Sequence, residues 1–217
     1  DRNGSFEKSD GRYLTDVLAD EAVGFITRHS NEQFFLMVTW NAPHSPLQAP
    51  EEVTQKYIDA GFDLGTAVIY AMIEVMDVGI GKIRQALDSA GIADDTILMF
   101  TSDNGPAFTH REDQVTNGMS VDERRFNCGF AGQKGSVYEG GIRVPMIAKW
   151  GNGLPMDIDI SEQFVFTDWL PTLLSLAGAS HIGNKPLDGY DMTSVLRGET
   201  INFEPRRFWQ WNNYSPI

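Results

Sequence analysis

The stretch TILMFTSDNGPAF, residues 96–108, decides the fold class of this chain. It begins as an apolar run, which favours a strand covered on both faces, and stops at Asp103, Asn104 and Gly105. A carboxylate and an amide oxygen side by side at the end of a buried strand suit a hard cation such as Ca²⁺ or Mg²⁺. The alternative interpretation is an Asx turn closed by Gly105, which needs no ligand.

Apolar strands alternate with amphipathic helices along the rest of the chain. Two further apolar runs predict strands: FFLMVTW at 34–40 and VPMIAKW at 144–150. The first is expected to be covered on both faces, and Pro145 in the second suggests a position near the start of the strand or at an edge. Apolar residues recur at helical spacing in three segments, which predicts helices at 13–29, at 63–90 before Gly91, and at 167–177 with Thr167 and Asp168 as caps. This order predicts an α/β fold, with a mostly parallel sheet between helices.

Composition limits the class of protein and of partner. With 217 residues, 41% of them hydrophobic, the chain is predicted to form a single domain over residues 1–217. Its formal net charge of −13 argues against nucleic acid or an anionic membrane as the main partner. No apolar run approaches the roughly 18 residues that span a bilayer. The one cysteine, Cys128, excludes an internal disulfide and is interpreted as a small loop thiol rather than a nucleophile.

A second polar cluster, NAPHSP, follows the predicted strand at 34–40. Its prolines stiffen the backbone, so His44 should project from a loop where it can donate a proton or hydrogen-bond an anion. An ordinary exposed histidine is the alternative. Because parallel sheets bind ligands at the carboxyl ends of their strands, this cluster and Asp103–Asn104 are expected at the same rim.

The segment GQKGSVYEGGIRVP, residues 132–145, places Lys134 between two glycines. Glycines allow the backbone to approach a ligand closely, while the ammonium supplies a point charge for an anion. A solvated turn lysine is the alternative. Glu139 and Arg143 are interpreted as a structural ion pair. Residues 105–135 are polar with little periodicity, which is typical of a functional loop.

Six segments together resemble one known family, in the family's order: YLTDVLADEAVGFI, FFLMVTWNAPHSPLQAP, MIEVMDVGIGKIRQAL, DDTILMFTSDNG, GQKGSVYEGGIRVPMIAKW and DWLPTLLSLAG. The family is the formylglycine-dependent sulfatases (arylsulfatases) of the alkaline phosphatase superfamily. The resemblance implies an alkaline-phosphatase-like α/β/α sandwich. The sandwich is expected to be incomplete, because the whole chain resembles the second half of a sulfatase catalytic domain.

The resemblance also implies a role for each matching residue. Asp103 and Asn104 match two calcium ligands, and Lys134 matches the lysine that binds a sulfate oxygen. His44 matches the histidine beside the sulfate ester, either as a contact or as proton donor to the leaving oxygen. The family's formylglycine arises from a C/S-x-P-x-R motif that this chain lacks. That nucleophile and further calcium ligands are expected upstream of residue 1.

The leading hypothesis is therefore a portion of a sulfuric ester hydrolase that uses calcium, inactive as this segment alone. Its substrate would be a sulfated sugar or another small sulfate ester, with no nucleic-acid or membrane partner. Family members are often periplasmic, secreted or lysosomal. Two alternatives remain: a phosphatase or phosphonate-ester hydrolase of the same superfamily, and a non-catalytic binding module that keeps the fold. Oligomeric state is left open.

Overall fold

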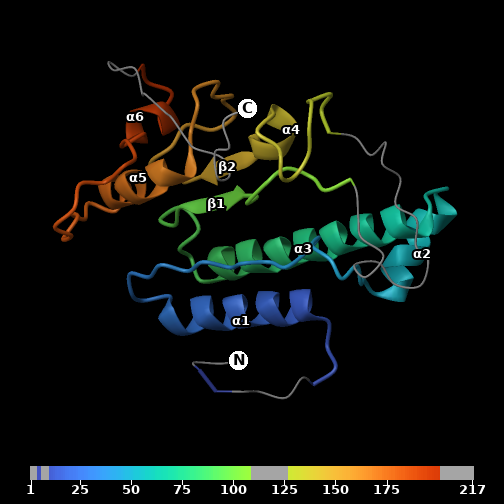
Figure 1. Cartoon of the computed structure of the whole chain (residues 1–217). Helices are drawn as coiled ribbons and strands as arrows, with labels where there is room; N and C mark the ends of the chain where they lie inside the picture. Colours follow the sequence, from blue (N-terminus) through green and yellow to red (C-terminus); the bar gives the residue numbers. More distant parts are fainter. Residues whose placement is uncertain (1–3, 6–9, 109–126, 201–217) are drawn as a thin grey trace. The chain divides into compact units, whose positions relative to one another are not determined.

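A computed structural model describes residues 4–5, 10–108 and 127–200 (Figure 1). The contacts gather into two compact units, Asp1–Ala93 with Ser102–Val144 and Asp94–Thr101 with Pro145–Ile217. We describe each unit by itself. The single domain over 1–217 stays a prediction, and much of the predicted functional loop at 105–135 lies outside the described residues.

Three helices build the first unit. The predicted helices at 13–29 and 63–90 are confirmed as α1 (Leu14–His29) and α3 (Leu64–Ser89). The Asp63 carboxylate caps α3 by accepting a hydrogen bond from the Thr66 N–H, at 3.1 Å. The third helix, α2 (Glu51–Asp59), was not predicted, although Pro50 before it and two glutamates in its first turn are typical helix-start signals.

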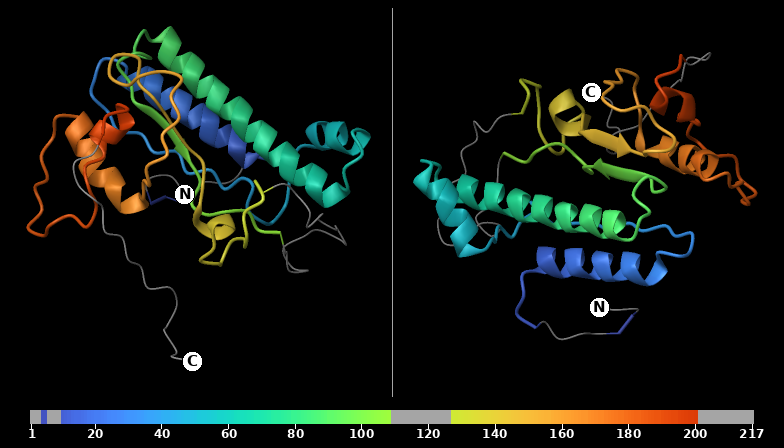
Figure 2. Two further views of the ribbon diagram at one scale, coloured as in Figure 1. Left: turned by 90° about the horizontal axis from the view of Figure 1, so that it is seen from above. Right: turned by 180° about the vertical axis from the view of Figure 1, so that it is seen from behind.

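The core of this unit lies along α3, which runs beside α1 in the views of Figure 2. By length and composition α3 could cross a membrane, but half of its most apolar window is buried within the protein, as in a core helix. Its first half packs with the buried loop residues Ala42 and Leu47. Its second half packs, through Ile83 and Leu87, against α1. Each such buried aliphatic side chain contributes about 1.5–3 kcal/mol of transfer free energy.

The segment 34–40, predicted to be a strand covered on both faces, has a different structure. The segment is extended but forms no ladder, and its side chains alternate between two environments. One set packs against α1 and α3: Phe34, Leu36, Val38 and Trp40. The other face is open, with Phe35 75% and Met37 71% exposed. The prediction that both faces are covered is therefore wrong for the described part of the chain, because nothing there packs on the second face.

A close approach fixes this segment against the helices at Gly79. A Cβ at Gly79 would lie 2.9 Å from the Trp40 ring and 3.2 Å from the Ala19 methyl group. Real Cβ atoms essentially never show the first of these separations. The absence of a side chain at Gly79 is thus what lets the indole and α1 meet α3.

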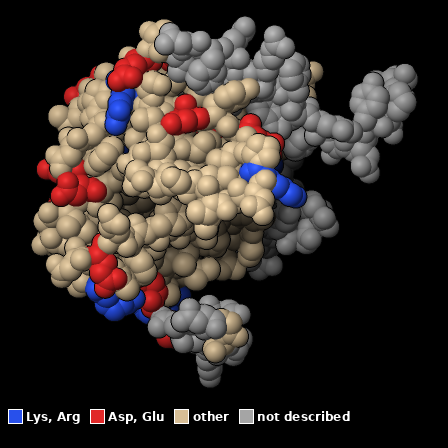
Figure 3. Space-filling view, turned by 90° about the vertical axis from the view of Figure 1, so that its left-hand side faces the viewer, with Lys and Arg blue, Asp and Glu red and all other residues tan. Residues whose placement is uncertain are grey.

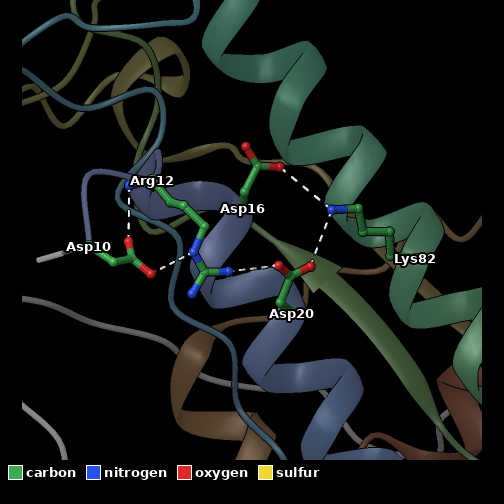
Figure 4. Close-up of polar contacts among 5 residues, drawn as sticks. All are labelled: Asp10, Arg12, Asp16, Asp20 and Lys82. Carbon is green, nitrogen blue, oxygen red and sulfur yellow. Dashed lines mark hydrogen bonds and ion pairs between the residues drawn. The ribbon is translucent and has the colours of Figure 1, made fainter.

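Polar side chains tie the elements of the first unit together at its surface. Figure 4 shows Lys82 of α3 between Asp16 and Asp20 of α1, at 3.6 and 3.3 Å, with Arg12 linking Asp20 to Asp10. On the face drawn in Figure 3, the blue Lys and Arg side chains likewise stand singly beside red carboxylates. Exposed pairs of this kind contribute little to stability, because solvent screens their charges.

A second polar group joins α2 to α3. Glu74 Oε2 accepts hydrogen bonds from Lys56 Nζ and Tyr57 Oη, both at 2.7 Å. The hydrogen bonds from Lys56 and then Tyr57 lower the pKa of the Glu74 carboxyl below its ordinary value of 4.5.

The second unit contains β1 (Leu98–Thr101) and β2 (Met146–Lys149), where strands were predicted. They pair antiparallel, with Leu98 opposite Lys149. This pair thus departs from the mostly parallel sheet that the alternation predicts. The connection between the strands, residues 102–145, includes the short helix α4 (Glu139–Ile142) and is long enough for a parallel crossover, so its length does not determine the direction of pairing. Ile147 is exposed and β1 half-buried, so neither strand is covered on both faces.

The other described elements of this unit are η2 (Phe166–Asp168), α5 (Trp169–Leu176) and α6 (Thr193–Leu196). The helix predicted at 167–177 is confirmed, but Asp168 does not cap it through its side chain. The fully buried carboxylate instead accepts hydrogen bonds from the backbone N–H groups of Val165, at 3.0 Å, and Tyr190, at 2.9 Å. Asp168 thereby fixes the loop before α6 to the start of α5.

Candidate functional site

The Asp103–Asn104 pair follows β1 directly and is held by its own loop. Ser102 Oγ donates to the Asn104 carbonyl oxygen at 3.0 Å, and Asn104 Nδ2 donates to the Gly105 carbonyl oxygen at 2.9 Å. The side-chain amide nitrogen of Asn104 is thus hydrogen-bonded within its own loop. No described residue donates to the Asn104 side-chain oxygen or to the exposed Asp103 carboxylate.

Geometry excludes the Asx turn that was the alternative interpretation. Such a turn at Asp103 needs the N–H of Gly105, but that N–H donates to the Gly141 carbonyl oxygen at 2.9 Å. A turn at Asn104 would need the N–H of residue 106, which is a proline. The side-chain oxygens of both residues therefore remain available to a cation.

A glycine-rich contact joins this loop to the segment that carries Lys134. Besides the Gly105–Gly141 bond, the Lys134 N–H donates to the Pro106 carbonyl oxygen at 2.8 Å. A Cβ at Gly105 would overlap the Gly140 carbonyl oxygen, and one at Gly140 would overlap that of Gly132. We call residues 102–108 and 131–142, joined in this way, the paired loops. Their backbones approach so closely that only glycine fits at these positions.

The Lys134 backbone is thus fixed within the paired loops, while its side chain is exposed and pairs with no carboxylate of the described chain. The prediction that Glu139 and Arg143 form a structural ion pair is confirmed. Arg143 Nη1 lies 2.9 Å from Glu139 Oε1, and the guanidinium sits 4.8 Å from the centre of the Phe130 ring.

His44 lies in a loop anchored on both sides by Ala42 and Leu47, which are buried against α3. The backbone N–H of His44 donates to the Asn41 carbonyl oxygen at 2.8 Å. The ring Nδ1 lies 2.7 Å from the Ser45 carbonyl oxygen. A carbonyl only accepts, so Nδ1 carries a proton, and Nε2 faces no described hydrogen-bond partner. Nε2 is therefore the nitrogen that can act on a ligand.

Backbone hydrogen bonds of the paired loops join the segment that carries Asp103 and Asn104 to the segment that carries Lys134. No hydrogen bond or ion pair between described residues links His44 to them, so convergence of all four stays a prediction. Within residues 4–5, 10–108 and 127–200, no group of three His, Cys, Asp or Glu side chains lies close enough to hold a metal ion. Asp103 and Asn104 fit a calcium ion chemically but supply two of its usual six to eight oxygen ligands.

Sequence reasoning missed the role of Gln133. Its side-chain oxygen accepts a hydrogen bond from the Phe108 N–H at 2.8 Å, across the paired loops. Nothing in a glutamine between glycine and lysine signals a partner 25 residues away. Cys128 is exposed, as expected of a loop thiol.

Comparison with known proteins settles the family. The sequence model of the sulfatase family, described as Sulfatase, matches residues 1–179. The chain belongs to the sulfatase family. It is 33% identical over 203 residues to steryl-sulfatase of Mus musculus, covering 92% of this chain and 30% of that protein. It is 30% identical over 225 residues to a sulfatase of Formosa agariphila, covering 95% of this chain and 38% of the relative.

Solved structures confirm the predicted fold class of this sulfatase chain. Ps i-CgsB in complex with k-i-k-neocarrahexaose superposes with a TM-score of 0.75 at 32% identity, over 91% of this chain and 41% of that one. The alkaline-phosphatase-like α/β fold is therefore confirmed. The chain spans about a third of the length of the curated relatives it matches.

Proposed function

We propose that this chain is the portion of a sulfate-ester hydrolase that holds calcium through Asp103 and Asn104 and binds the sulfate group through Lys134 and His44. The observation that carries the proposal is that the side-chain oxygens of Asp103 and Asn104 accept no hydrogen bond from a described residue, in a loop bonded to the segment that carries Lys134. Family membership supplies the reaction class, since the relatives are named steryl-sulfatase, arylsulfatase and N-acetylgalactosamine-6-sulfatase.

Sulfate-ester hydrolysis needs charge stabilisation at two places. Negative charge builds on the sulfuryl oxygens and on the oxygen of the departing alcohol as the S–O bond breaks. A bound calcium would supply positive charge beside the sulfuryl oxygens. Lys134 adds a second positive charge to a sulfuryl oxygen from a backbone fixed by the Pro106 bond. The nucleophile is expected from residues outside these 217.

His44 serves the departing oxygen. The Ser45 carbonyl fixes the proton on Nδ1, so the protonated ring presents Nε2–H as the donor. Transfer of that proton to the alkoxide releases the alcohol as the S–O bond breaks. The substrate class we propose is a sulfated sugar or a similar small ester, since one structural neighbour is in complex with k-i-k-neocarrahexaose.

The test measures kcat/KM of the full-length enzyme on matched aryl sulfates and aryl phosphates. Lys134→Ala should lower kcat/KM for the sulfate on the order of 10²–10³-fold, as expected for a lost charge contact in the transition state. Lys149→Ala, an exposed lysine on β2, is the control and should leave the rate unchanged. A full-length enzyme that prefers the phosphate would favour the phosphatase alternative and contradict the proposal.

His44→Ala separates proton donation from simple binding. A proton donor matters most when the leaving alcohol is a weak acid, so the loss of rate should grow from nitrophenyl to alkyl or sugar sulfates. An equal loss for all leaving groups would show that His44 only contacts the sulfate.

For the metal, Asp103→Asn should weaken calcium binding to the full-length enzyme in isothermal titration. Unchanged affinity would remove Asp103 from the ligand set.

A further inference from the structure

The ammonium of Lys134 is positioned through its backbone. Its side chain is exposed and pairs with no carboxylate of the described chain, and a flexible four-carbon stem does not fix a charge by itself. The backbone N–H of Lys134, in contrast, donates to the Pro106 carbonyl oxygen at 2.8 Å. The place of the charge relative to Asp103 and Asn104 therefore depends on how firmly residues 106–108 hold this bond.

Gln133 supplies a second bond between the same two segments. Its side-chain oxygen accepts a hydrogen bond from the Phe108 N–H at 2.8 Å. The N–H groups of Lys134 and Phe108 thus donate across the paired loops in opposite directions, to Pro106 and to Gln133. Residues 106–108 cannot swing about one of these bonds while the other is kept, so the glutamine steadies the carbonyl group that holds Lys134.

The backbone of Gln133 is itself held in place. Its carbonyl oxygen accepts a hydrogen bond from the Ser136 N–H at 2.9 Å, which closes a turn around Lys134. A Cβ at Gly141 would lie 2.6 Å from the same carbonyl oxygen, so the two backbones are in close contact. The residue is half-buried, although Lys134 beside it is exposed. Gln133 therefore links the two segments through a side chain that is anchored at both ends.

We propose that Gln133 is a positioning residue for the sulfate-binding lysine. Its bond to Phe108 holds residues 106–108 so that the Pro106 carbonyl fixes the Lys134 backbone, and this sets the distance between the ammonium and a sulfuryl oxygen. The inference rests on the proposed role of Lys134 in sulfate binding. Gln133 contacts neither the sulfate nor the metal in this scheme, so its effect on the reaction passes through Lys134.

A double-mutant cycle in the full-length enzyme tests the inference, with kcat/KM for an aryl sulfate as the readout. Gln133→Met keeps the length of the side chain but replaces the amide oxygen by a weak acceptor. With Lys134 present, it should lower kcat/KM roughly 10–100-fold, as expected for a contact misplaced by up to about 1 Å. In the Lys134→Ala background it should lower kcat/KM less than about 2-fold, because no ammonium is left to misplace.

Three outcomes would overturn the inference. An equal loss in both backgrounds would show that Gln133 acts on the fold as a whole rather than through Lys134. A wild-type rate for Gln133→Met would show that its bond does not matter for the reaction. If Lys134→Ala alone keeps the wild-type rate, the proposed role of Lys134 is wrong, and this inference falls with it. Gln133→Asn, which keeps the amide but is one methylene shorter, is the second variant and should follow Gln133→Met.

Matched measurements separate positioning from a structural role. All assays run below the melting temperature of every variant. Gln55→Met changes an exposed glutamine of α2, whose amide donates to Asp59 at 2.7 Å, and should leave kcat/KM unchanged. Calcium affinity of Gln133→Met, measured by isothermal titration, should match that of the wild type. A marked loss of calcium affinity would assign the Gln133 bond to the loop of Asp103 and Asn104 and overturn the inference.

Discussion

The paired loops and the segment 34–40 differ in how the hydrogen-bonding groups of an extended backbone are satisfied. In the paired loops, 102–108 and 131–142 bond to each other within one unit and exclude side chains from the contact. In 34–40, one face is packed but both edges and the outer face are open among the described residues. The first region is closed by its own chain, whereas the second is left open among the described residues.

The stability of the two regions has different sources. Closure of the paired loops depends on backbone contacts whose residues are all present, so substitutions inside the chain should break it. The order of 34–40 depends on packing beneath it, so substitutions in the helices should affect it more than changes at its edges. The following predictions compare closure of the paired loops with the polar contacts between the helices, from the largest effect to the smallest.

Gly105→Ala should be the most damaging change, because its Cβ overlaps the backbone carbonyl of Gly140 and neither backbone can move away freely. We expect a loss of about 3 kcal/mol or more in the free energy of unfolding, measured by urea denaturation. The matched control is Gly81→Ala in α3, where nothing lies within 4 Å. That change should stabilise by about 0.5–1 kcal/mol. Equal effects at both glycines would contradict the close contact.

Gln133→Ala should have a smaller effect on the paired loops. It removes the acceptor for the Phe108 N–H, and a half-buried donor left unsatisfied costs about 1–3 kcal/mol. Gln133→Glu keeps an acceptor oxygen and should recover most of the loss. Denaturation of both variants checks this. A loss as large as that of Gly105→Ala would show that side chains, rather than glycine backbones, hold the loops together.

Glu74→Gln tests a contact between helices that depends on pH. The hydrogen bonds from Lys56 and Tyr57 lower the folded-state pKa of Glu74 below 4.5, so its contribution is present above that value and is lost as pH falls through the folded value. Wild type should therefore exceed the variant in stability near neutral pH, and the difference should shrink below pH 4.5. Thermal melts at both pH values measure it. Glu162→Gln, at an exposed position, is the matched control in the same melts.

Lys82→Ala should have the smallest effect. Its ion pairs with Asp16 and Asp20 are exposed, so the expected loss is about 0.5 kcal/mol and should fade at high salt. Lys185→Ala, another exposed lysine, serves as the control in the same salt series. A large loss of stability that does not change with salt concentration would mean that Lys82 supports α1 through packing of its aliphatic chain rather than through its charge.

Local patterns predicted the long helices well and the sheet poorly. The four-and-three spacing of α3 and the cap at Asp63 depend on neighbours in sequence, and both are found. The direction of β1 and β2 and the open face at Phe35 depend on partners far away in the chain or outside it, which no local pattern carries. The same distinction applies at the site. Residue chemistry singled out Asp103, Asn104, His44 and Lys134, but the Gln133 bridge is visible only in three dimensions.

The absence of a side chain at Gly79 affects the position of His44, a residue that Gly79 does not contact. Trp40 rests where a side chain at Gly79 would stand, and the chain reaches His44 four residues later. A methyl group there would push the indole outward, and the displacement would pass along the chain to the imidazole. If His44 acts as proposed, a mutational scan of the full-length protein should therefore record an activity defect at Gly79, in the middle of α3, caused by displacement of the imidazole of His44.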